Sequence, residues 1–148
     1  MNKHERPQIL LVSRGFVFDA ANHFLLIRRS ERDRRNPGLW ECPGGKLDKG
    51  QELHRAFERE VMEETGLLVE PTEHMAYVDG YVVDKGPYEG MPYVSIFSIG
   101  KSIGGKLQLS EEHIDSAWVT SDEALDYDLT PETRKALIVL EKHLGKEK

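Results

Sequence analysis

The stretch EREVMEETG, residues 58–66, places four glutamates in nine positions. In an α-helix with about 100° between successive residues, Glu63 lies about 60° to one side of Glu60, and Glu64 about 40° to the other. These three carboxylates therefore share one side of the helix, and Glu58 points away from them. An apolar stripe with the i, i+3, i+4 spacing of a core-facing surface borders the same side: Leu53, Ala56, Phe57 and Val61. The sequence thus predicts a helix whose acidic cluster lies beside its buried face.

Three physical costs oppose such a cluster in a purely structural helix. Like charges at i,i+4 lose roughly 0.2–0.5 kcal/mol, carboxylates near a helix C-terminus oppose the macrodipole, and partial burial removes hydration. Only Arg59 is near enough within the helix to compensate. A hard divalent cation requires this arrangement, because several carboxylate oxygens must point at one place. The adjoining apolar stripe disfavours the alternative of a solvated charged face, and the three costs disfavour the alternative of a purely structural acidic helix.

A glycine-rich segment precedes the predicted helix. The run LWECPGGKLDKGQ, residues 39–51, is interpreted as a short strand that ends at Pro43 and is followed by a turn. In that turn, Gly44 and Gly45 allow the backbone to approach a ligand closely. A strand, a glycine turn and an acidic helix therefore form one unit.

The spacing from Gly45 to Leu67 closely resembles the signature of the Nudix hydrolases. That signature is Gly, five residues, Glu, seven residues, Arg-Glu-apolar, any residue, Glu-Glu, any residue, Gly, apolar. Both apolar positions and six fixed residues match: Gly45, Arg59, Glu60, Glu63, Glu64 and Gly66. With ordinary residue frequencies, six matches at fixed spacing arise by chance about once in ten million placements. The sequence departs at one position, because Gln51 stands where the family has its first glutamate.

The resemblance implies an α/β fold, a Nudix-type α/β/α sandwich around a mixed β-sheet. It also implies a pyrophosphohydrolase that cleaves a nucleoside diphosphate linked to another group and uses Mg²⁺ or Mn²⁺ as its cofactor. The metal ligands that it implies are the carbonyl of Gly44 and the carboxylates of Glu60, Glu63 and Glu64. Catalytic roles are expected for Glu63 and for Arg59, which would orient a carboxylate, and Lys46 is expected to help neutralise phosphate. Gln51 would keep only a hydrogen-bonding version of the first glutamate.

Two residues outside the signature are candidates by resemblance to MutT-like members of the family. Arg29, in the arginine-rich residues 27–38, is expected to contact a substrate phosphate with its forked donors, although such charge runs are often solvated loops. Glu112 lies six residues before Trp118, close to where MutT-like enzymes carry an additional acid. It is expected to be a metal ligand or a general base, and an exposed loop glutamate is the alternative. His113 is a minor candidate for proton transfer.

Length, composition and charge limit the class of protein. With 148 residues, of which 39% are hydrophobic, one domain spanning residues 1–148 is expected. The single cysteine, Cys42, is typical of a reducing compartment, and no apolar run has the length of a membrane span. We therefore expect a soluble cytoplasmic protein without membrane contact, as a monomer or homodimer. The net charge of -6 disfavours nucleic-acid polymers as partners and leaves small nucleotides as substrates.

Apolar runs and capping residues predict the remaining elements. Residues 9–19 and 23–30 are predicted to form a β-hairpin, and further strands are predicted at residues 73–84, 91–100 and 115–120. Thr120 and Glu123 form a capping box that predicts a short helix. A last helix is predicted from Pro131 to Leu144, with Thr130 as its N-cap.

The sequence leaves the substrate open. MutT-like enzymes read an oxidised guanine with an asparagine near the start of the last helix, but this chain has no asparagine after Asn36 and carries Thr130 near that place. We therefore keep 8-oxo-dGTP, other nucleoside triphosphates and ADP-ribose as candidates. A regulatory domain that binds a nucleotide without hydrolysis is the alternative function, suggested by Gln51 and disfavoured by the intact glutamates of the helix.

Overall fold

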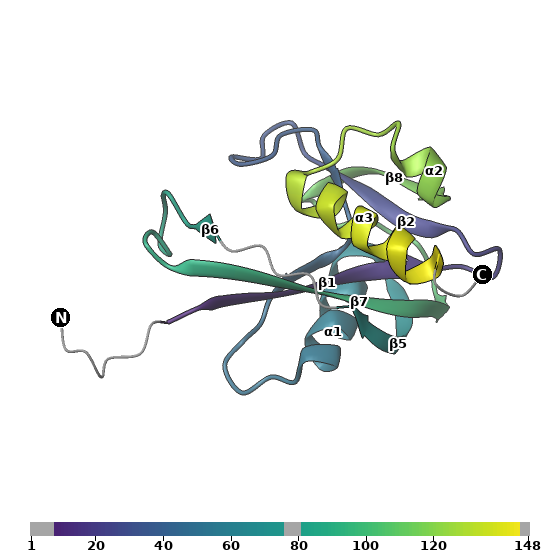
Figure 1. Ribbon diagram of the computed structural model, residues 1–148, viewed down its shortest axis with the longest axis horizontal. Helices are drawn as coiled ribbons and strands as arrows, with labels where there is room; N and C mark the ends of the chain where they lie inside the picture. Colours follow the sequence, from purple (N-terminus) through teal and green to yellow (C-terminus); the bar gives the residue numbers. More distant parts are fainter. Residues whose placement is uncertain (1–7, 76–80, 146–148) are drawn as a thin grey trace.

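The computed structural model describes residues 8–75 and 81–145. These residues form a β-sheet flanked by helices (Figure 1). The strands are β1 (Leu10–Phe18), β2 (Phe24–Arg29), β3 (Trp40–Glu41), β4 (Gly44–Lys46), β5 (Leu67–Met75), β6 (Tyr81–Val82), β7 (Pro92–Gly105) and β8 (His113–Val119). The helices are α1 (Leu53–Thr65), α2 (Ser121–Ala124) and α3 (Pro131–Gly145). Within the described ranges, no helix combines the length and the apolar character that a membrane span requires.

All of these strands belong to one mixed sheet. Its main path runs β3-β2-β1-β7-β5, with β4 beside β1, β6 beside β7 and β8 beside β2. Strands β1 and β7 are parallel along their whole shared length, from Leu10 opposite Tyr93 to Phe18 opposite Lys101. The other pairings are antiparallel. The long parallel pair therefore forms the centre of the sheet.

Strands β1 and β2 separate beyond the turn that joins them. They pair at Phe18 and Phe24, next to that turn. Farther along, β4 lies beside β1, with Gly44 opposite Arg14, and β3 lies beside β2, with Glu41 opposite Ile27. The segment that contains Glu41 and Gly44 is therefore held between the two diverging strands, next to α1.

Two apolar clusters attach helices to opposite faces of the sheet (Figure 1). The cluster under α1 comprises Val17, Leu25, Ile27, Phe57, Val61, Leu67 and Val69. The cluster under α3 includes Phe16, Phe24, Phe97, Ala136, Leu137 and Leu140. Burying one such large side chain stabilises the fold by roughly 1.5–3 kcal/mol. The predicted α/β/α sandwich is confirmed.

Predictions of two helix starts and of the hairpin are also confirmed. In addition, the acidic helix ends at Gly66, whose left-handed φ of 76° places its N–H on the carbonyl of Met62. Thr120 and Glu123 form the predicted capping box of α2, and the Thr130 hydroxyl accepts the N–H of Thr133 at the start of α3. The predicted hairpin is the antiparallel pair β1–β2.

Several predicted strand limits were wrong. The predicted glycine turn is instead strand β4, because the separation of β1 from β2 leaves backbone groups of β1 for it to pair with. Strand β5 begins at Leu67, and Pro71 is tolerated within it because the register with β7 shifts between Pro71 and Glu73. Strand β7 continues to Gly105 because β5 pairs with it that far, and β8 begins at His113, opposite Arg29. The part of the predicted strand 73–84 at residues 76–80 lies outside the described residues.

Candidate active site

The three glutamates predicted to share one side of α1 line a cleft of about 500 Å³. They differ in exposure, because Glu64 is buried, Glu60 is half-buried and the side chain of Glu63 is 55% exposed. The opposite wall of the cleft comes from the loop before β8 and consists of Ser110, Glu111 and Glu112. The cleft is therefore acidic on both sides.

Glu64 is the most perturbed acid of this cleft. One of its oxygens accepts the backbone N–H of Gly44 at 2.7 Å. Burial nevertheless raises the pKa of Glu64 from its ordinary value of 4.5 to about 8, although Arg14 and the Gly44 N–H both favour the ionised form. Without a cation, Glu64 is therefore mostly protonated at neutral pH.

Glycines make the room that these carboxylates occupy. A Cβ added at Gly45 would lie 2.5 Å from the carboxylate carbon of Glu60, so the Glu60 side chain would have to move to make room for it. A Cβ at Gly44 would lie 2.3 Å from the carbonyl oxygen of Ser13, and the φ of Gly44 is 154°. The Gly44 carbonyl, predicted to be a metal ligand, accepts a long hydrogen bond of 3.4 Å from Nη1 of Arg14. Backbone and helix carboxylates thus meet without intervening side chains.

Arg59 connects the residues of the signature. Its Nη1 donates to Glu63 at 3.2 Å, and its Nη2 lies 3.3 Å from an oxygen of Glu60. Nη2 also donates to the amide oxygen of Gln51 at 3.2 Å and lies 3.2 Å from Asp48. Gln51 therefore accepts a hydrogen bond from Arg59 with an uncharged amide oxygen, in line with the hydrogen-bonding role expected of it. Arg59 contacts the carboxylates that it is predicted to orient, and its catalytic role remains a prediction.

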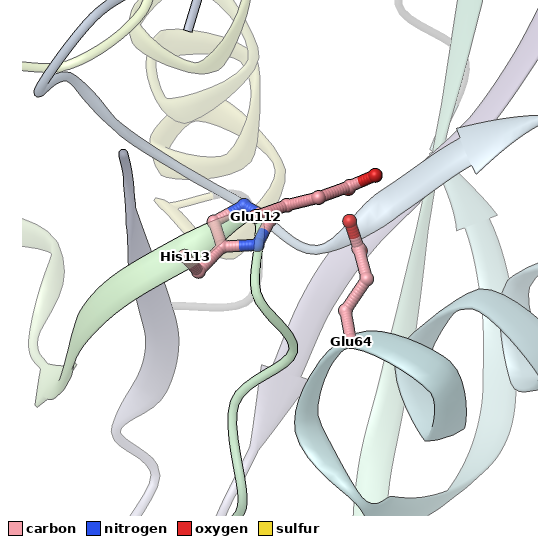
Figure 2. A group of neighbouring side chains, drawn as sticks. All are labelled: Glu64, Glu112 and His113. Atoms are coloured by element: carbon pink, nitrogen blue, oxygen red, sulfur yellow. The ribbon is translucent and has the colours of Figure 1, made fainter. Parts of the chain in front are cut away.

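The structure brings Glu112 and His113 to Glu64, although Glu112 follows Glu64 by 48 positions in the sequence. Figure 2 shows the carboxylates of Glu64 and Glu112 approaching each other, with the ring of His113 beside them. One potential ligand atom of each side chain lies within 4.8 Å of the other two. The side chain of His113 is only 1% exposed, and its Nε2 lies 2.9 Å from Oε2 of Glu41. The loop acid predicted from the sequence thus faces the helix acids.

A network of buried charges lies next to the cleft and was missed by the sequence analysis. Arg14 forms ion pairs with Glu41 at 3.5 Å and with Glu132 at 3.1 Å. Burial opposes the ionisation of Glu41, but Arg14, Arg29 and the His113 hydrogen bond together hold the pKa of Glu41 below its ordinary value. One signal was available, because Arg14 and Glu41 interrupt the otherwise apolar runs LLVSRGFVF and LWECP.

Arg29 and Lys46 lie outside the group of residues that line the cleft. The Nη1 of Arg29 donates to Glu41 at 2.7 Å, and its Nη2 forms an ion pair with Asp33. Lys46 is exposed at the end of β4, with its Nζ 4.9 Å from the centre of the Tyr88 ring. Among the described residues, neither side chain belongs to the cleft lining. Their predicted contacts with phosphate remain predictions.

The donors of the cleft fit a hard divalent cation. Such ions take several carboxylate and carbonyl oxygens, and the cleft concentrates these from α1 and from the loop before β8. Burial raises the pKa of Glu64 by more than the positive charge of Arg14 and the Gly44 N–H lower it. Glu60 shows the same tendency, since burial and the neighbouring Glu63 raise its pKa against the effect of Arg59. A cation of charge +2 would compensate both groups.

Comparisons with known proteins agree with this geometry. The family model described as the NUDIX domain matches residues 10–140. The nucleoside triphosphatase NudI of Escherichia coli is 28% identical over 119 residues, which cover 77% of this chain and 84% of NudI. The solved MutT protein from Methanosarcina mazei Go1 has a TM-score of 0.77 and 26% identity, covering 97% of this chain and 99% of that one. The MutT NUDIX hydrolase from Burkholderia pseudomallei has a TM-score of 0.71 and 27% identity, covering 88% of this chain and 96% of that one. The chain therefore belongs to the Nudix family of pyrophosphohydrolases.

Proposed function

We propose that this protein hydrolyses a pyrophosphate bond in a nucleoside diphosphate linked to another group, in a reaction that requires Mg²⁺ or Mn²⁺. Nucleoside triphosphates are the first substrate class to test, because the Escherichia coli relative is named a nucleoside triphosphatase. The observation that carries the proposal is the cleft in which Glu60, Glu63 and Glu64 of α1 face Glu112. A polyphosphate could enter this acidic cleft only together with cations, because the acids would otherwise repel it.

The cation ligands in this proposal are the carbonyl of Gly44 and the carboxylates of Glu60, Glu63 and Glu64. When bound, the cation would supply positive charge to the phosphate oxygens and to the attacking water. The residues of the chain set the geometry. Gly44 holds Glu64 through its N–H, and the absence of a side chain at Gly45 leaves room for the carboxylate of Glu60.

The remaining residues of the cleft would position the water and its proton. Arg59 contacts Glu63 and Glu60 and would limit the directions in which their oxygens point. We assign Glu63 as a proton acceptor, because it lines the cleft and is the exposed member of the helix group. Glu112 would act from the opposite wall, as a ligand or as a second proton acceptor. To bind a cation or to accept a proton, Glu63 and Glu112 must each be an ionised carboxylate.

Arg29 and Lys46 are the proposed contacts for substrate phosphate. The guanidinium of Arg29 is already paired with Glu41 and Asp33. A phosphate would therefore share the guanidinium with these carboxylates or replace one of them. Arg29 Nε is buried without a hydrogen-bond partner among the described residues, so this N–H is not used by the two carboxylates. Lys46 is exposed and would add a mobile charge.

The structure does not favour recognition of an oxidised guanine at Thr130. Thr130 is only 3% exposed, and its hydroxyl donates to Thr133 at 2.9 Å. The hydroxyl is therefore engaged in capping α3. We keep 8-oxo-dGTP as one member of the substrate panel without special preference.

The test is a turnover assay on the full chain with a panel of nucleoside triphosphates, 8-oxo-dGTP, ADP-ribose and nucleotide sugars. Coupled inorganic pyrophosphatase would release free phosphate from the pyrophosphate product of the triphosphates, and alkaline phosphatase would release it from the monophosphate products of ADP-ribose and nucleotide sugars. The proposal predicts turnover of at least one class with Mg²⁺ or Mn²⁺ and its loss in Glu64→Gln, while Glu58→Gln serves as the control. Tight nucleotide binding without turnover would instead support a regulatory domain, the alternative raised by Gln51.

A further inference from the structure

His113 and Glu41 form a buried pair beside the cleft. Their side chains are 1% and 3% exposed, and His113 Nε2 lies 2.9 Å from Oε2 of Glu41. Arg14 and Arg29 also contact Glu41, which keeps it an ionised carboxylate. An ionised carboxylate only accepts hydrogen bonds. The proton of this hydrogen bond therefore lies on Nε2 of His113.

The other ring nitrogen is left with a free lone pair. His113 Nδ1 is buried and has no hydrogen-bond partner among the described residues. A buried polar atom without a partner costs free energy, so this one requires an explanation. In metal sites, a ligating histidine usually donates its second N–H to a carboxylate, which fixes the tautomer and the ring orientation. The Glu41–His113 pair has this arrangement.

Two carboxylates lie close to the His113 ring and complete a set of three ligands. One potential ligand atom from each of Glu64, Glu112 and His113 lies within 4.8 Å of the other two. Figure 2 shows that these side chains come from different elements, namely the end of α1, the loop before β8 and the start of β8. Glu112 is exposed and free to adjust, whereas Glu64 and His113 are buried and held by hydrogen bonds. The group therefore has a rigid part and an adaptable part.

We propose that Glu64, Glu112 and His113 form a second cation site, with Nδ1 of His113 as a nitrogen ligand, next to the carboxylate site of α1. Imidazole nitrogen favours transition metals, whereas Mg²⁺ prefers oxygen ligands in octahedral geometry. This site therefore takes Mn²⁺, Co²⁺ or Zn²⁺ in preference to Mg²⁺. This proposal rests on the proposed function only because the two cation sites share Glu64. It assigns Glu112 the role of a metal ligand.

The direct test uses metal-stripped full-length protein saturated with Mn²⁺. Pulsed electron paramagnetic resonance detects nitrogen bound to Mn²⁺, and calorimetry measures the affinities for Mn²⁺ and Mg²⁺ separately. His113→Gln keeps an N–H donor for Glu41 but removes the imidazole. Glu112→Gln leaves the Glu41–His113 pair intact and serves as a second variant if His113→Gln fails to fold. His143→Gln is the matched control, because His143 pairs with Glu73 on an exposed surface.

We expect nitrogen coupling in the wild type and in His143→Gln, and none in His113→Gln. The affinity for Mn²⁺ should fall about tenfold or more in His113→Gln and in Glu112→Gln, because even the loss of a residue that only supports a metal ligand lowers metal affinity by about that factor. The affinity for Mg²⁺ should change much less. Absence of nitrogen coupling in the Mn²⁺-saturated wild type would overturn the proposal, as would its persistence in folded His113→Gln. These readouts do not depend on turnover, so hydrolysis that persists in excess chelator would contradict the proposed function and leave this test intact.

Discussion

Replacing Glu64 by glutamine should separate the stability of the fold from activity. Burial raises the pKa of Glu64 from 4.5 to about 8, so the folded protein keeps a proton that the unfolded chain loses between these pH values. Stability of the metal-free protein therefore falls as pH rises from 4.5 to 8, by at most about 5 kcal/mol in total and about 3 kcal/mol at pH 7. Glutamine carries no titrating proton and keeps an oxygen for the N–H of Gly44.

The assay is urea unfolding in EDTA at pH 5, 7 and 8, combined with single-turnover rates in Mg²⁺. Glu64→Gln should be more stable than wild type at pH 8 and nearly equal to it at pH 5. Its hydrolytic rate should fall by about a hundredfold or more, the scale for the loss of one preorganised electrostatic group. Glu58→Gln is the control, since Glu58 pairs with Arg55 away from the cleft, and it should change neither quantity much. A Glu64→Gln protein that unfolds more easily than wild type at pH 8, or that keeps a near-normal rate, would refute this reasoning.

Three further substitutions test other parts of the site. Arg29→Ala should raise KM more than it lowers kcat, because a ground-state phosphate contact is uniform binding; steady-state kinetics that show an unchanged KM would assign Arg29 to structure alone. Gly45→Ala should abolish most activity while the chain still folds, because the added Cβ would lie 2.5 Å from the Glu60 carboxylate; normal Mg²⁺ binding in this variant by calorimetry would contradict that geometry. Glu41→Gln should cost about 3–5 kcal/mol at pH 7 by leaving Arg14 and Arg29 short of a buried anion. The pKa of Glu41 is lowered in the folded state. The stability that ionised Glu41 contributes is therefore fully present above its ordinary pKa near 4.5 and is lost as pH falls through the lower folded value. The difference between Glu41→Gln and wild type in urea unfolding should accordingly shrink in acid.

Patterns confined to one helix or one hairpin were predictable from the sequence. Periodicity placed Ala56, Phe57 and Val61 on the buried face of α1, and capping chemistry located the start of α2 at Thr120. The shared direction of Glu60, Glu63 and Glu64 follows from helix geometry alone. These features depend on residues within a few positions of one another.

Features that depend on distant pairing were harder to predict. The separation of β1 from β2 admits β4 beside Arg14, and no local pattern encodes that separation. The Arg14–Glu41–Glu132 network joins three segments that are distant in the sequence. No residue near each of these charges in the sequence therefore indicates its partner. Glu112 was found only by resemblance to MutT-like enzymes, and its approach to Glu64 depends on how β8 pairs with β2. The single domain over residues 1–148 remains a prediction.

The central claim is that the acidic cleft holds a divalent cation that hydrolysis requires. The most direct measurement titrates Mg²⁺ into metal-stripped protein at pH 7 and determines cation occupancy by calorimetry. Product release is measured in the same buffer with a substrate identified from the panel. The account predicts no turnover in excess EDTA, a rate that rises with the same midpoint as Mg²⁺ occupancy, and proton release on binding, because Glu64 must lose the proton that its raised pKa retains. Full turnover in excess EDTA, or Mg²⁺ occupancy that leaves the rate unchanged, would contradict it.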